Sequence, residues 1–72
     1  MGRLSLINKK NVEEIYSFFL NEMAKFSYKK KSSIRSDVST LIFENNKKAI
    51  FIKISKLNFR KTYIEITATL VN

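Results

Sequence analysis

The sequence contains no cysteine and no histidine. Without cysteine the chain can form neither a disulfide nor a thiolate metal site, and without histidine it lacks the commonest metal ligand and general base. The carboxylates number six, and two of them, Glu13 and Glu14, are explained by the start of a helix. No glycine-rich phosphate loop, metal-spaced cluster or nucleophile motif is present. We therefore expect neither a bound cofactor nor an enzymatic activity.

Proline is also absent, and Gly2 is the single glycine. The boundaries between helices and strands must therefore be predicted from the positions of asparagine, serine and charged residues. No apolar run exceeds four residues, far below the roughly 20 that span a bilayer. The N-terminus also lacks the apolar core of a secretory signal. The sequence thus predicts a cytoplasmic protein that makes no use of a membrane.

A chain of 72 residues allows one domain. Its apolar content of 44% argues against disorder, so residues 1–72 are expected to form a single small basic domain. Such a short chain buries only a fraction of its surface, and association would add to its stability. A homodimer is therefore one expected state.

Residues 11–28 carry the clearest helical period. Asn11, with Glu14 three residues later, predicts a capping box. Lys25 and Lys29 near the other end complement the helix dipole. Apolar side chains recur at the spacing of one helical face, at Val12, Ile15, Tyr16, Phe19, Met23 and Phe26. These features predict one amphipathic helix.

After Lys31 the period changes to two, which is typical of strands buried on one face. Residues 48–57 and 62–71 are the clearest strands, residues 37–44 form a third, and residues 4–7 are a short candidate before the helix. The inward positions of the two clearest strands are Ile50, Ile52 and Ile54, then Ile64, Ile66, Ala68 and Leu70. The sequence thus predicts an α+β fold in which one amphipathic helix packs on a three- or four-stranded antiparallel β-meander.

Charge is the most informative property of the chain. Lysine and arginine number 14 against six acids, which gives a formal net charge of +8. The surplus falls in two acid-free stretches, from Lys25 to Arg35 and from Lys47 to Lys61. Several like charges on a small molecule sum into a field that attracts polyanions. The expected partner is DNA or RNA.

Three groups of side chains make up the predicted nucleic-acid-binding site. The first is Lys29, Lys30 and Lys31 with Arg35, on what the sequence indicates is a flexible link after the helix. The second is Phe51, Lys53 and Tyr63, on the sheet face predicted to lie away from the helix, where rings can stack on bases and lysine neutralises phosphate. The third is Lys47, Lys48, Lys56, Arg60 and Lys61, of which the last two lie at a hairpin turn. Lysine predominates and has little geometric selectivity, so we expect backbone-directed binding with little sequence preference.

Other interpretations stay open. Phe51 and Tyr63 could form a cross-strand pair or be covered by a second subunit. A protein-binding module is the main alternative, because the apolar side chains Phe18, Leu20, Phe51 and Phe59 exceed what one small core needs. The composition, rich in lysine, asparagine and isoleucine, suits an inhibitor or regulator encoded by a phage or plasmid that docks on a host or defence complex. Attachment to a membrane surface is disfavoured, because the predicted helix carries three acids.

Overall fold

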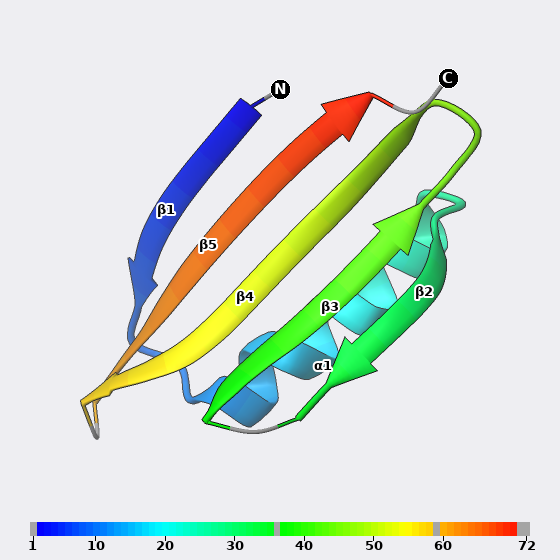
Figure 1. The fold of residues 1–72 in the computed structure, drawn as a ribbon. Coiled ribbons are helices and arrows are strands. Elements are labelled where there is room, and N and C mark those ends of the chain that lie inside the picture. The colour runs from blue at the N-terminus through cyan, green and yellow to red at the C-terminus, as the bar shows by residue number, and fades with distance from the viewer. Residues whose placement is uncertain (1, 36, 59, 71–72) are drawn as a thin grey trace.

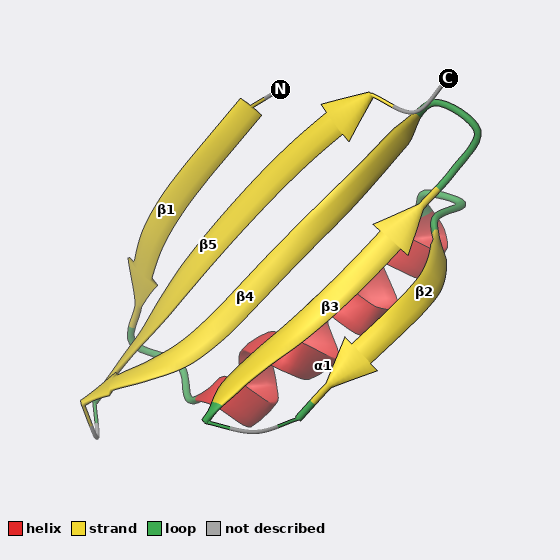
Figure 2. Ribbon diagram, in the orientation of Figure 1, coloured by secondary structure: helices red, strands yellow, loops and turns green. Residues whose placement is uncertain are grey.

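The structure, a computed structural model, describes residues 2–35, 37–58 and 60–70. One antiparallel sheet holds five strands in the order β1-β5-β4-β3-β2, and the helix α1 lies across one of its faces (Figures 1 and 2). The elements are β1 (Gly2–Asn8), α1 (Val12–Lys25), β2 (Lys29–Ile34), β3 (Val38–Glu44), β4 (Lys48–Asn58) and β5 (Lys61–Leu70). The predicted α+β fold is confirmed, with five strands in place of three or four.

The helix begins where the sequence predicts. The side-chain Oδ1 of Asn11 accepts a hydrogen bond of 2.9 Å from the backbone N–H of Glu14, which satisfies one of the donors left free at a helix start. Glu13 and Glu14 occupy the first turn and Lys25 the last, and both signs are favourable for the helix dipole.

Replacing Asn11 by alanine should lower the free energy of unfolding by about 1 kcal/mol, because the cap bond is lost. Chemical denaturation followed by circular dichroism measures this difference. Asn21→Ala is the matched control, since Asn21 is an exposed residue inside α1 and alanine has the higher helix propensity there. Equal losses in the two variants would contradict the capping role of Asn11.

The helix ends at Lys25, before the predicted end at Tyr28. Ser27 adopts a positive φ of 65°, a conformation that commonly follows the last helical turn. Phe26, which the sequence placed on the apolar stripe, consequently lies at the cap and is 70% exposed. No helix within the described ranges is long and apolar enough to cross a membrane.

The core lies between α1 and the sheet face that it covers. Leu41, Ile52 and Ile66 stand side by side on β3, β4 and β5. Leu41 and Ile52 form one buried apolar cluster with Ile15 and Tyr16 of the helix, and Ile66 packs against it. The predicted packing of the helix stripe against the isoleucine faces is therefore confirmed at these positions. The inward assignment does not extend to the end of β5, because Leu70 is 74% exposed.

The segment after the helix is a strand, so the prediction of a flexible link there is wrong. Lys29–Ile34 pairs with β3, with a register shift between Lys30 and Ser32. Every residue of this edge strand is exposed. Backbone hydrogen bonding to β3, rather than side-chain burial, holds β2 in place. For that reason its sequence lacks the alternation of apolar and polar residues by which a strand is predicted.

The sheet is elongated, and its loops gather at two opposite ends. The molecule measures 39 × 22 × 19 Å along its principal axes. The β1–α1 loop and the β4–β5 turn share one end, whereas the α1–β2 and β3–β4 connections share the other (Figure 1). Charged residues on these connections therefore lie at two opposite ends of the sheet.

Candidate nucleic-acid interface

The fold divides the basic stretches of the sequence between the two ends of the sheet. The strand β4 runs from one end to the other, and its residues Lys48 and Lys56 are about 26 Å apart at the usual rise per strand residue. Lys47 and Lys48 therefore lie at one end, whereas Arg60 and Lys61 lie with Lys56 at the other. The stretch that looks continuous in the sequence forms two surfaces.

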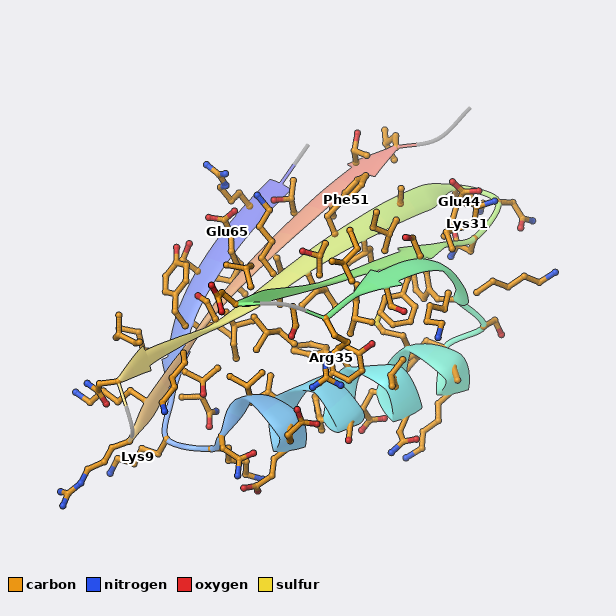
Figure 3. The ribbon with its side chains drawn as sticks, turned by 60° about the horizontal axis from the view of Figure 1, so that its bottom comes forward. Lys9, Lys31, Arg35, Glu44, Phe51 and Glu65 are labelled. Carbon is orange, nitrogen blue, oxygen red and sulfur yellow. The ribbon has the colours of Figure 1, made fainter. Side chains whose placement is uncertain are left out.

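One end carries five cations, which we call the turn cluster: Lys9, Lys10, Lys56, Arg60 and Lys61. All five line one cavity between the β1–α1 loop and the β4–β5 hairpin, and Figure 3 shows Lys9 at this end. Lys56, Arg60 and Lys61 belong to the site predicted from the sequence, whereas Lys9 and Lys10 do not. The pairing of Asn8 with Thr62 brings these distant segments together.

Hydrogen bonds to the backbone fix the loops that carry the turn cluster. The hydroxyl of Thr62, which is 2% exposed, donates to the carbonyl oxygen of Lys10 at 2.6 Å. The Asn8 Oδ1 accepts from the backbone N–H of Lys10 at 2.8 Å, and the Asn58 Oδ1 accepts from that of Arg60 at 2.8 Å. The β1–α1 loop is thereby tied to β5, and the cluster rests on a defined backbone.

Little acidic charge opposes the turn cluster. Among the residues that the structure describes, Lys9, Lys10, Lys56 and Lys61 form no ion pair. Glu13 also lines the cavity, but its carboxylate is in an ion pair with a cation outside the cluster, Arg35. The start of α1 borders the same cavity and adds the positive end of its dipole. The cavity is a place of concentrated positive charge.

Arg35, which belongs to the predicted binding site, contacts the helix. Its guanidinium pairs with Glu13 and lies 4.1 Å from the centroid of the Tyr16 ring. Figure 3 shows Arg35 between the sheet and α1. A cation over a tyrosine face is attracted by the ring quadrupole, so Arg35 helps to hold the end of β2 against the helix.

The opposite end carries a second group, which we call the edge cluster: Lys29, Lys30, Lys31, Lys47 and Lys48. Lys29 and Lys31 line a shallow cavity together with Glu44, and Lys31 and Glu44 are seen close to one end of the sheet in Figure 3. Lys29 and Glu44 are also directly opposite in the β2–β3 ladder. The carboxylate lowers the positive potential here, so the edge cluster is the weaker of the two anion-attracting surfaces.

On the sheet face away from α1, the two aromatic residues of the predicted site are not neighbours. Phe51 is on this face (Figure 3) and is half-buried. It lies opposite Thr67, whereas Tyr63 lies opposite Ser55. The two aromatic residues are thus about 13 Å apart along the strands, and the interpretation as a cross-strand pair is wrong. Only one ring at a time could stack on a given base.

Glu65 reduces the positive charge on this same face. Arg3 forms an ion pair of 3.2 Å with it, and Lys53 is its direct neighbour across the β4–β5 ladder. The hydroxyl of Tyr63 lies 3.1 Å from Ser5 Oγ and 3.4 Å from Glu65 Oε2. Lys53 and Tyr63, both assigned to the site, are therefore less available to phosphate than the lysines of the turn cluster.

The surface offers charge rather than reactive groups. Within the described ranges no three histidine, cysteine or acidic side chains are grouped so that they could hold a metal ion. Five cations line the cavity of the turn cluster, whereas two line the cavity beside the edge cluster. Comparison of the chain with protein-family models, with curated proteins and with solved structures finds no significant match in any of the three.

Proposed function

We propose that this protein binds nucleic acid through the phosphate backbone, with the turn cluster as the principal contact. The observation that carries the proposal is that five cations from two distant segments line one cavity. Cations in such an arrangement neutralise neighbouring phosphates and release condensed counterions, which supplies affinity without regard to sequence. Four of the five are lysines, which read bases poorly, so little sequence preference is expected.

The edge cluster supplies a second contact on the same ligand. The two clusters are about 26 Å apart along β4, which corresponds to about 8 base pairs of duplex at 3.4 Å each. A shorter duplex cannot touch both clusters, so affinity should rise when duplex length passes this value. Phe51 and Lys53 lie between the two ends on β4 and contribute less, because Glu65 is beside them.

Binding to DNA and RNA oligonucleotides should weaken steeply as salt is raised. Neutralisation of five phosphates by the turn cluster alone gives a slope of about −4.5 for log K against log salt with duplex DNA, and contact with the edge cluster makes the slope steeper. Fluorescence anisotropy with labelled duplex DNA, single-stranded DNA and RNA of equal length measures it. Two unrelated sequences of one length should give the same affinity and slope. Absence of binding to all three ligands at low salt would overturn the proposal.

The alternative function, a protein that docks on a host or defence complex, depends on exposed apolar side chains. Of the four that suggested it, Phe18 is 55% exposed, Leu20 and Phe51 are half-buried, and Phe59 lies outside the described residues. The face around Phe51 therefore gives this alternative less support than the sequence indicated. A cytoplasmic location and an origin in a phage or plasmid stay predictions from composition.

A further inference from the structure

The two edges of the sheet are built differently. The edge strand β2 carries three lysines and a register shift between Lys30 and Ser32, and lysines and bulges are devices by which natural sheets prevent pairing of an exposed edge. The other edge, β1, has neither device. Its register with β5 is unbroken from Gly2 to Asn8, and its one charged residue, Arg3, is paired with Glu65. The β1 edge is thus regular and locally neutral.

Apolar side chains are exposed along the same edge. Leu4 is 53%, Leu6 40% and Ile7 60% exposed. Leu4 and Leu6 are on the side of the sheet that α1 covers, because they pair with Ile66 and Ile64. The helix lies over the half of the sheet formed by β4, β3 and β2 (Figure 1). Leu6 instead lines an apolar cavity with Phe18, which is 55% exposed.

We propose that β1 pairs in antiparallel fashion with β1 of a second copy, so that two sheets join into one of ten strands. A two-fold axis beside Ser5 pairs all seven residues of the strand. In this register Leu4 lies opposite the partner's Leu6, and Ser5 lies opposite the partner's Ser5. Since Leu4 and Leu6 are on one face, the apolar layer below the helices continues across the axis.

Charge does not oppose this register, despite the high net charge of each copy. Arg3 and the partner's Arg3 would be about 13 Å apart along the strands, beyond the screening length of roughly 8 to 10 Å. Lys9 and Lys10 follow the end of β1 and so lie outside the paired segment, at opposite ends of the dimer. The lysines of β2 are on the far edge of each sheet. The contact is therefore made by the least charged side of the molecule.

Sedimentation equilibrium over a wide range of protein concentration tests the proposal. The apparent mass should rise from the 8.5 kDa of one chain to twice that value. Leu4→Lys places a charge near the centre of the interface and should raise the dimer dissociation constant roughly tenfold or more. Ile34→Lys is the matched control, because Ile34 is 55% exposed on the opposite edge. A chain that stays monomeric throughout, or a dimer weakened equally by both substitutions, would overturn the proposal.

Single-cysteine variants test the register without depending on a disruptive change. The chain has no cysteine of its own, so Ser5→Cys introduces the only thiol. Directly opposed residues of antiparallel strands have Cα atoms about 4.5 to 5.5 Å apart, within the range of a disulfide. Mild oxidation should therefore convert Ser5→Cys to a covalent dimer, and Ser32→Cys on β2 should stay monomeric. Cross-linking of Ser32→Cys at the same rate, or none of Ser5→Cys, would contradict pairing through β1.

Discussion

Replacing Phe43 by alanine should lower the free energy of unfolding by about 3 to 5 kcal/mol. The side chain is 2% exposed and belongs to the apolar cluster that α1 closes, so its removal leaves a cavity as well as losing buried area. A domain of this size has roughly 4 to 11 kcal/mol of stability in total. Urea denaturation followed by circular dichroism measures the midpoint and slope, and the variant should unfold at a much lower urea concentration.

Phe26→Ala is the control for this substitution. Phe26 is 70% exposed at the end of α1, so its truncation should change stability by at most about 0.5 kcal/mol. Phe19→Ala should fall between the two, because Phe19 is half-buried and packs at the margin of the cluster. If Phe43→Ala unfolded at the same urea concentration as Phe26→Ala, Phe43 could not be part of the core.

Removing the hairpin half of the turn cluster should abolish most nucleic-acid binding. The triple variant Lys56→Ala, Arg60→Ala, Lys61→Ala loses three cations from one cavity. The slope of log K against log salt should become about 2.7 less steep. If the parent and the variant bind equally at 1 M salt, the variant then binds roughly 500-fold more weakly at 0.1 M salt. All three residues are exposed, so the fold should persist, and circular dichroism checks that it does.

The matched control is the triple variant Lys29→Ala, Lys30→Ala, Lys31→Ala, which removes the same charge from the edge cluster. Its loss of affinity should be smaller, because Glu44 already reduces the potential there. Anisotropy titrations of both variants at one salt concentration give the comparison. Equal losses would mean that net charge, and not the cavity between the loops, determines the affinity.

Patterns of period two and 3.6 were enough to predict α1, β4 and β5, because each of these elements buries one side of itself. The strand β2 was missed for the opposite reason. Its side chains are all exposed, so its position depends on backbone bonds to β3 that leave no mark on the residue types. Periodicity therefore predicts elements that bury one face in the core. It misses an exposed edge strand that is held only by backbone hydrogen bonds to its neighbour.

The same distinction holds for the candidate site. Lys56, Arg60 and Lys61 could be grouped from the sequence because a local turn holds them together. Lys9 and Lys10 could not, since only the pairing of the first strand with the last brings them to that cavity. Local sequence patterns do not predict which segments far apart in the chain lie side by side.

The pairing of β1 with β5 also has a consequence for how the chain folds as it is made. The contact between Arg3 and Glu65 spans 62 residues, so at 5 to 20 residues per second a ribosome needs roughly 3 to 12 seconds to supply the partner of the first strand. The contacts among the helix, β2, β3 and β4 are more local in sequence, and all of these residues are made before Glu65 is added. Leu4, Leu6 and Ile7 meanwhile stay unpaired on a nascent chain. The strand β1, which is proposed to pair with a second copy, is thus also the strand whose partner within its own chain is synthesised last.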